Sequence, residues 1–323
     1  MEIWHGQAAV PSDISGSVLT IGVFDGLHRG HQELISQAVT RAKELGLPAI
    51  MVTFDPHPVA VFLPQQGPAQ LTTMPQRLAY AEKLGIDKVL IIDFTRELAG
   101  LSPQHYYSAL IQDTLKARAV YVGENFTFGK DSAGTAETLQ ELGDNAGIET
   151  HIVGLVAEED EVLCSSLVRK YLDATDVVGA SWVLGRPFSV TAKIVHGAGR
   201  GGKTLGFPTA NQYFPETVAL PADGVYAGWI TITDSGPIEG TMEAGKRYMA
   251  AVSVGTNPTF GADPHSVESF VIGQEANLYG HTATVEFIDF LRPMTKFSSI
   301  DELIATINCD VQQATEILKR SSD

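Results

Sequence analysis

The spacing of apolar residues changes once along this sequence, close to residue 186. Before that point, short β-branched runs alternate with longer stretches whose apolar residues recur every three or four positions. The runs predicted to be buried strands are 18–23, 49–54, 88–93, 119–123 and 151–156. Alternating strands and helices predict a doubly wound, Rossmann-like parallel sheet, which binds ligands at the carboxyl ends of its strands.

Local signals place the helices within this alternation. The helix after the first strand has one apolar face, made of Leu34, Ile35, Ala38, Val39, Ala42 and Leu45. Two later helices are predicted to begin after Thr73 and Ser102, because each is a good N-cap followed by a proline at one of the first two helical positions. The N-terminal part is therefore predicted to be an α/β domain.

Beyond residue 186 the sequence predicts strands that are separated by turns and not by helices. These strands are 188–196, 225–233, 247–254, 266–272 and 282–288, and one helix over 299–319 closes the chain. Such a pattern is typical of an antiparallel β-barrel or sandwich. Because 323 residues exceed the usual size of a single core, we expect two domains, residues 1–185 and 186–323.

The charge balance argues against a nucleic-acid partner. The chain has 38 acidic and 22 basic residues, a net charge of −16, whereas phosphate neutralisation needs clusters of Lys and Arg. Residues 186–215 nevertheless contain four basic residues and no acidic one. A local anion site and a glycine-rich loop that lacks acids by chance explain this stretch equally well.

The sequence also predicts a cytoplasmic protein with no membrane partner. Residues 1–5 lack the layout of a signal peptide, and no apolar run is long enough to span a bilayer. Cys164 and Cys309 lie far apart and outside any CxxC spacing, so neither a disulfide nor a zinc site is expected.

The segment 22–31, Gly-Val-Phe-Asp-Gly-Leu-His-Arg-Gly-His, joins the first strand to the first helix. Glycines let the backbone approach a ligand, and a helix N-terminus favours phosphate. His28 and His31 flank a glycine there, and imidazolium groups neutralise charge on a departing polyphosphate. An isolated H-x-G-H is more often two surface histidines, but its place after the first strand favours a function in catalysis.

Segments 22–31, 53–58 and 123–129 resemble the adenylyltransferase module of the bacterial bifunctional riboflavin kinase/FMN adenylyltransferases, also called FAD synthetases. The resemblance implies that ATP and its phosphates contact Gly22, Phe24, Asp25, His28 and His31. It implies an FMN site at Asn125, Phe126 and Phe128, and further phosphate ligands at Ser165, Ser166 and Arg169.

The segment that holds these last ligands departs from the family pattern. Cys164 stands where relatives have serine, Ser166 where they have threonine, and Val162 where many have a basic residue. The hydroxyls and the guanidinium are kept, so we expect activity with an altered nucleotide affinity. Taken alone, two serines before a short helix more often form an N-cap.

Residues 197–204 match the P-loop expression, but Gly206 and Pro208 would break the helix that a P-loop requires, so a P-loop NTPase is rejected. The stretch 197–211, with segments 224–228, 255–260 and 267–270, resembles the riboflavin kinase module instead. The backbone of the glycine-rich loop is predicted to cradle phosphate, as nests do, with contacts at Gly197, Gly199, Gly201, Lys203, Thr209 and Asn211. The resemblance assigns Mg²⁺ to Thr209 and Asn211 and the role of general base to Glu268. Arg292 follows the last predicted strand and is expected to contact the nucleotide or the flavin.

Simpler interpretations exist for these residues too. A carboxylate on a barrel strand is usually just solvated, and Pro-Thr-Ala-Asn alone would indicate a turn. Adenylyltransferases for nicotinate nucleotide or pantetheine phosphate lack a second domain, and a class I aminoacyl-tRNA synthetase would need a KMSKS loop. A non-catalytic flavin-binding protein is the alternative from another class.

The function predicted from the sequence is phosphorylation of riboflavin to FMN, followed by adenylylation of FMN to FAD with release of pyrophosphate. The expected substrates are riboflavin, FMN and ATP, with Mg²⁺ as the metal. The oligomeric state stays open, with a homo-oligomer among the options.

Overall fold

The computed structural model describes residues 1–63, 67–196, 208–255 and 265–321. Contacts divide the chain into two compact units, the first made of Met1–Pro68 and Thr72–Ser165, the second of Ala69–Leu71 and Ser166–Asp323. Helix α8 (Val177–Leu184) and most of α7 (Ser165–Asp173) therefore group with the second unit. The boundary at residue 186 stays a prediction, and a test by fragments is given below.

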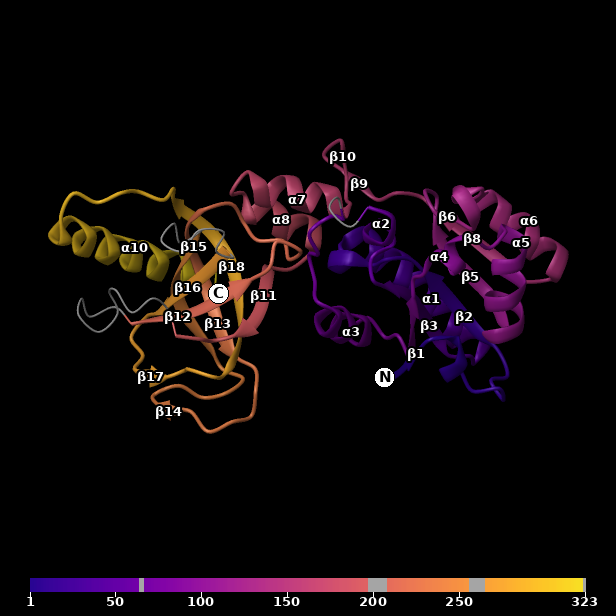
Figure 1. The fold of residues 1–323 in the computed structure, drawn as a ribbon, viewed down its shortest axis with the longest axis horizontal. Coiled ribbons are helices and arrows are strands. Elements are labelled where there is room, and N and C mark those ends of the chain that lie inside the picture. The colour runs from indigo at the N-terminus through magenta and orange to yellow at the C-terminus, as the bar shows by residue number, and fades with distance from the viewer. Residues whose placement is uncertain (64–66, 197–207, 256–264, 322–323) are drawn as a thin grey trace. The chain divides into compact units, whose positions relative to one another are not determined.

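The first unit contains a six-stranded parallel sheet in the order β1–β4–β3–β2–β5–β8 (Figure 1). Its strands are β1 (Glu2–His5), β2 (Ser17–Ile21), β3 (Ala49–Asp55), β4 (Lys88–Asp93), β5 (Ala117–Gly123) and β8 (Glu149–Val153). After β2 the chain adds β3 and β4 on one side and then returns to place β5 on the other. The sheet thus has its topological switch point between β2 and β5, where doubly wound sheets bind ligands. The predicted fold is confirmed, and β1 is an edge strand that the sequence did not predict.

Helices cover both faces of this sheet, and each face has its own core. On one face lie α1 (Arg29–Leu45) and α3 (Met74–Lys83), which bury side chains such as Ile35 and Ala81. On the other lie α6 (Ala136–Ala146) and the π-helical stretch η3 (Tyr107–Thr114), with Leu110 and Leu139 at the centre. The predicted apolar face of α1 is buried except for Leu45, which is 37% exposed.

The two predicted helix starts are confirmed. Thr73 caps α3 through a capping box with Gln76, and the Ser102 hydroxyl accepts the N–H of His105 at the start of α5 (Pro103–Tyr106). The remaining short elements of this unit are η1 (Gln7–Ala9), η2 (Asp25–Leu27), α2 (Pro58–Phe62), α4 (Arg96–Ala99), β6 (Thr127–Phe128), η4 (Lys130–Ser132), β7 (Gly134–Thr135), β9 (Ala157–Glu158) and β10 (Glu161–Val162).

The second unit is built on a six-stranded antiparallel sheet in the order β11–β18–β13–β15–β16–β12 (Figure 1). The strands are β11 (Phe188–Lys193), β12 (Thr209–Phe214), β13 (Gly224–Ile232), β15 (Arg247–Gly255), β16 (His265–Val271) and β18 (Thr282–Arg292). A separate small ribbon pairs β14 (Glu239–Gly240) with β17 (Ala276–Asn277). The predicted antiparallel architecture is confirmed, and β12 is a strand that was not among those predicted.

The two edges of this sheet meet, so that it forms a nearly closed barrel. Just after β11, the N–H of Val195 donates to the carbonyl oxygen of Asn211 in β12 at 2.9 Å. Inside, Gln212 is fully buried, and its Nε2 donates to the carbonyl oxygens of Ala192 and Ala283 at 2.7 and 2.8 Å. One side chain of β12 thus joins β11 and β18 across the seam.

The outer face of the barrel is partly covered by the closing helix α10 (Ile300–Arg320). Ala314 and Leu318 of α10 pack with Ala227 of β13 and Ala251 of β15. Ile300, the first residue of this helix, is apolar but 62% exposed. The helix covers β13, β15 and β18, and the site residues of β12 and β16 lie on the same face of the sheet.

Candidate functional site

The first group of predicted site residues lies where β2 leads into α1, at the carboxyl edge of the parallel sheet. Phe24 has a left-handed backbone conformation with φ of 53°, and Gly26 has φ of 80°. These two residues turn the chain through η2 to His28, the N-cap of α1. Unpaired backbone N–H groups of the first helical turn are therefore located at the switch point, an arrangement that favours anions.

The two predicted histidines stack on each other within this first turn. The ring centroids of His28 and His31 are 3.7 Å apart, and the ring of Phe24 meets His31 edge-on at 5.1 Å. Burial lowers the pKa of His31 well below its ordinary value, helped by the charges of His28 and Arg77. The lowered pKa favours the neutral imidazole of His31, and neutralisation of phosphate charge by His28 and His31 stays a prediction.

A buried polar network supports this loop from beneath. Asp25 is 3% exposed, and its Oδ1 accepts the N–H and the hydroxyl of Thr72 at 3.2 and 3.3 Å. The Thr72 hydroxyl in turn accepts the N–H of Gly26 at 3.1 Å, and Nη2 of Arg77 lies 3.7 Å from Asp25 Oδ1. The family resemblance assigned Asp25 to phosphate binding. In the structure, its contacts place it where it holds the loop in shape.

The start of α7 also contacts the loop. The hydroxyl of Ser165 donates to the carbonyl oxygen of Asp25 at 2.9 Å. A Cβ atom added at Gly30 would lie 3.0 Å from the carbonyl oxygen of Leu163 and 3.2 Å from Nδ1 of His28. Glycine at position 30 therefore allows the backbone at Leu163, just before α7, to approach the start of α1 closely.

The other two residues predicted in this segment, Ser166 and Arg169, belong to the second unit. There Nε of Arg169 donates to the carbonyl oxygen of Ala69 at 2.8 Å. Of the two unusual positions nearby, Val162 is 40% exposed and Cys164 is half-buried as a free thiol. Phosphate binding by Ser166 and Arg169 stays a prediction.

The predicted flavin strip follows β5, on the other side of the switch point from the histidine loop. Asn125 is exposed directly after this strand. The rings of Phe126 and Phe128 stack with centroids 5.5 Å apart, and Phe128 is buried against Tyr106. Asn125 and part of Phe126 are thus accessible to a ligand, whereas Phe128 mainly supports Phe126 from the core.

The second group of predicted site residues lies on two neighbouring strands of the barrel, β12 and β16. Asn211 of β12 lies directly opposite Glu268 of β16, and Ser253 of β15 lies opposite Glu268 on its other side. Directly opposed residues share a face, and Thr209 shares it as well because it is two residues from Asn211. The fold thus brings Thr209, Asn211 and Glu268 together on one face of the barrel, and the roles assigned to them stay predictions.

The polar atoms of these residues fit a hard cation. Nδ2 of Asn211 donates to the carbonyl oxygen of Thr209 at 2.9 Å, which leaves Oδ1 of Asn211 as a free acceptor among the described residues. The hydroxyl of Thr209 is a second neutral oxygen, and Mg²⁺ prefers oxygen ligands. Burial raises the pKa of Glu268, an effect that the hydroxyl of Ser266 partly opposes. A carboxylate with a raised pKa is a stronger proton acceptor than a solvated one.

Arg292 is held by the closing helix. Its Nε and Nη2 donate to the two carboxylate oxygens of Asp310, both at 2.8 Å, and Asp310 is 5% exposed. This two-pronged ion pair joins the end of β18 to the middle of α10. The geometry favours a role in docking α10, so the ligand contact assigned to Arg292 stays a prediction. The phosphate contacts assigned to Gly197, Gly199, Gly201 and Lys203 lie outside the described residues.

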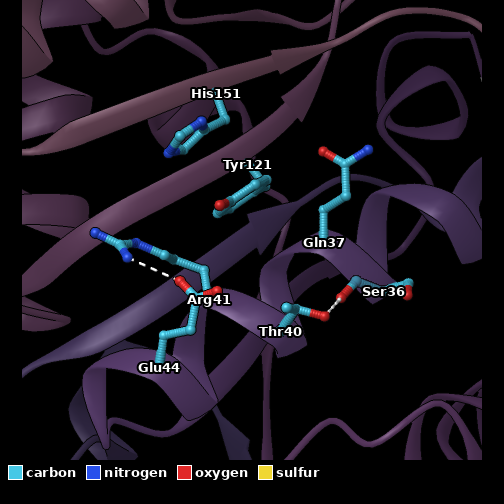
Figure 2. A pocket seen from close by; sticks show the side chains of 7 residues that line it. All are labelled: Ser36, Gln37, Thr40, Arg41, Glu44, Tyr121 and His151. Atoms are coloured by element: carbon cyan, nitrogen blue, oxygen red, sulfur yellow. Dashed lines mark hydrogen bonds and ion pairs between the residues drawn. The ribbon is translucent and has the colours of Figure 1, made fainter.

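A polar pocket of about 270 Å³ lies elsewhere, over α1, β5 and β8 (Figure 2). Its lining includes Arg41 and the stacked rings of Tyr121 and His151. The guanidinium of Arg41 already forms ion pairs with Glu44 and Glu149 at 2.8 and 2.6 Å. The cation in this pocket is therefore neutralised, and the pocket contains no predicted site residue.

The residue that sequence reasoning missed is Arg77. It lies on the buried face of α3, beside Asp25 and His31. One signal in the sequence could have identified it. Arg77 lies one helical turn before Ala81, and both are on the side of α3 that faces the core. Asp310 was missed as well, because it stands among apolar residues of α10 and has no local partner in the sequence.

Two family models match the chain: FAD synthetase over residues 10–167 and riboflavin kinase over residues 184–318. Among curated relatives, the bifunctional riboflavin kinase/FMN adenylyltransferase of Escherichia coli strain K12 is 32% identical and covers 97% of this chain and 95% of its own length. The proteins of the same name from Pseudomonas fluorescens and Bacillus subtilis strain 168 are 32% and 31% identical and cover 100% and 97% of this chain, and 99% and 96% of their own lengths.

One solved structure is similar over nearly the whole chain. It is a crystal structure described as a macrolide-efflux protein from Streptococcus pneumoniae, with 29% sequence identity and a TM-score of 0.86. The match covers 98% of this chain and 99% of that one. In the described part of the present chain, none of the helices combines the length and apolarity needed to cross a membrane.

Proposed function

The chain belongs to the family of bifunctional riboflavin kinase/FMN adenylyltransferases, and from that membership we propose where each of its two reactions takes place. The enzyme phosphorylates riboflavin to FMN and joins FMN to an adenylyl group to give FAD. We assign the first reaction to the barrel unit and the second to the parallel-sheet unit. The observation that carries this assignment is that each unit has its own group of polar residues, the histidine pair at the switch point and the Asn211–Glu268 row on the barrel.

In adenylyl transfer, a phosphate oxygen of FMN attacks the α-phosphate of ATP, and pyrophosphate leaves. The loop after β2 and the start of α1 would bind the phosphates through backbone N–H groups. His28 and His31 would donate hydrogen bonds to the charge that develops on the leaving pyrophosphate. Asn125 and Phe126 would hold the flavin after β5, so that both substrates meet at the carboxyl edge between β2 and β5.

In the kinase reaction, Glu268 would take the proton of the ribityl 5′-hydroxyl as that oxygen attacks the γ-phosphate of ATP and ADP leaves. The carboxylate is partly buried on the outer face of the barrel, which suits this task because its pKa is raised. Thr209 and Asn211 would hold Mg²⁺, which when bound neutralises charge on the nucleotide phosphates. Asn211 lies opposite Glu268, so base and metal ligand would act on the same phosphoryl group.

The proposal also covers the remaining phosphate ligands, the metal, the cellular location and the oligomeric state. Arg169 and Ser166 would bind nucleotide phosphates, and the basic, acid-free stretch 186–215 would act as an anion site of the kinase unit. We also propose that the metal is Mg²⁺ and that the protein is cytoplasmic. The oligomeric state stays open, and a homo-oligomer is one option.

The experiment is incubation of the full chain with riboflavin, ATP and MgCl₂, followed by chromatographic separation of the flavins. We expect riboflavin to decline, FMN to rise first, and FAD to follow. A parallel incubation with FMN in place of riboflavin tests adenylyl transfer alone. If FAD forms in neither incubation, the assignment of the first unit is wrong. If riboflavin is unchanged in the first incubation, the assignment of the barrel is wrong.

A further inference from the structure

Arg77 occupies a place in α3 where a soluble protein normally has an apolar residue. Arg77 and Ala81 are the buried residues of this helix, and Arg77 is 3% exposed. Arginine is almost never buried without full pairing, because removing a guanidinium from water is costly. The residue therefore needs an explanation beyond the packing of α3.

The contacts of this guanidinium compensate its charge only in part. Nη1 donates to the hydroxyl of Thr53 at 3.4 Å, and Nη2 lies 3.7 Å from Oδ1 of Asp25. The buried Nε has no hydrogen-bond partner within the part of the chain that the structure describes. Asp25 Oδ1 is also shared with the N–H and hydroxyl of Thr72. A guanidinium has five N–H donors, so two long contacts leave much of its positive field directed at its surroundings.

These surroundings are the loop that carries the histidine pair. Asp25 lies three residues before His28, and the charge of Arg77 acts on His31. The charged or titratable groups that act here are His28 and Arg77 on His31, and Asp25 and Asp55 on Arg77. His31 also has a buried Nδ1 without a partner among the described residues, so its ring is not fixed by a hydrogen bond at that atom. The orientation and the pKa of His31 therefore depend on the neighbouring rings of His28 and Phe24 and on the charge of Arg77.

We propose that Arg77 is a positioning residue for adenylyl transfer, which fixes Asp25 beneath the histidine loop and supplies a permanent positive charge behind the His28–His31 pair. This inference rests on the proposed function of the first unit. The guanidinium keeps its charge at every accessible pH, whereas an imidazolium would be lost above neutral pH. His31 then enters the reaction as a neutral hydrogen-bond donor, and the attraction for the polyphosphate comes from Arg77 and the helix N-terminus.

The test uses the full chain with Arg77→Gln and Arg77→Lys. Glutamine keeps hydrogen-bond donors near Asp25 and Thr53 but removes the charge, whereas lysine keeps the charge. The measurement is kcat/KM for FAD formation from added FMN and ATP between pH 5 and 9. FMN formation from riboflavin by the same preparations is the internal control, and Arg41→Gln is a matched control at an arginine paired on the surface of α1.

We expect Arg77→Gln to lower kcat/KM for adenylyl transfer at least tenfold and to move the acid limb of its pH profile to higher pH. Removal of a neighbouring positive charge raises the pKa of His31, so the ring becomes protonated at a higher pH than in the wild type. Because the proposal requires a neutral His31, activity should then be lost at a higher pH. Arg77→Lys should return the limb to its wild-type position while recovering only part of the rate. Arg41→Gln should change neither quantity.

A fall in rate with an unmoved acid limb would show that Arg77 is only structural and would overturn the proposal. So would an Arg77→Gln enzyme within threefold of wild type. If that variant does not fold, NMR titration of the His31 ring in the wild type still tests the proposal, because titration at the ordinary imidazole pKa would overturn it. Failure of the proposed function is distinguishable, because the wild type itself would then form no FAD.

Discussion

The two candidate sites are built in different ways. In the first unit, the residues from Gly22 to His31 lie within one loop, and their arrangement depends on left-handed backbone positions and on a buried network beneath them. In the second, Asn211 and Glu268 are 57 residues apart in the sequence and meet only through the pairing of β12 with β16. Substitutions of the residues that support the loop should therefore change the geometry of the first site. In the second site the strand pairing fixes the backbone, so its activity should depend mainly on the individual side chains.

The largest effect that tests this contrast is expected at Glu268. We expect Glu268→Gln to reduce FMN formation by roughly 10²–10⁴-fold, because glutamine keeps the shape but cannot take a proton. Adenylylation of added FMN should be unchanged, since Glu268 belongs to the barrel. The measurement is turnover at saturating riboflavin and ATP, and a loss of less than about threefold would remove Glu268 from the mechanism.

The matching change in the loop site is replacement of both histidines. We expect His28→Ala with His31→Ala to reduce FAD formation by about 10²–10³-fold, the usual effect of removing groups that stabilise developing charge. FMN formation should continue at its normal rate in the same tube. If both products disappear from a variant that circular dichroism shows to be folded, the model of two separate sites is wrong.

The contrast also predicts what the barrel needs in order to stand alone. A fragment from residue 186 to 323 should bind and phosphorylate riboflavin, but it lacks α8, whose Val177, Val183 and Leu184 are buried and which packs on β11 and β18. Each such side chain contributes about 1.5–3 kcal/mol when buried, so the fragment 166–323 should be several kcal/mol more stable. Thermal unfolding of the two fragments checks this difference, and equal midpoints would support the boundary at residue 186.

The smallest expected effect concerns the stability of the barrel. Because the folded state raises the pKa of Glu268, its carboxylate destabilises the folded unit as pH rises above the unfolded value of 4.5. Glu268→Gln should thus raise the unfolding temperature at pH 7.5 by about 1–3 °C and have no such effect at pH 4. The same raised pKa places the acid limb of the kinase profile above pH 4.5. A variant that melts earlier than the wild type at pH 7.5 would contradict this sign.

Sequence reasoning succeeded where a local pattern decides the structure. Thr73 and Ser102 were identified as helix caps because the side chain and the following proline act within one turn. The strand Lys88–Asp93 was predicted with its observed bounds, since a charged residue flanks its buried apolar run at each end. The same local reasoning identified the histidine loop, whose glycines and histidines stand side by side.

Sequence reasoning failed where a residue's neighbour comes from a distant part of the chain. The strand from Thr209 to Phe214 looked like a turn, and only its pairing with β16 makes it a strand. Arg77 has no partner nearby in sequence, because Asp25 and Thr53 reach it from two other elements. The bidentate pair between Arg292 and Asp310 likewise exists only once α10 has packed on the barrel.

The outer surface of the barrel, with α10 over part of it, has a consequence for how such an enzyme can change during evolution. One continuous sheet surface is covered by α10 at β13 and carries the proposed kinase site at β12 and β16. Under the proposed function, substitutions beneath α10 alter how firmly the helix is docked, and substitutions two strands away alter chemistry. Selection can therefore adjust the durability of the barrel and its turnover as nearly independent traits, although both are encoded on a single face.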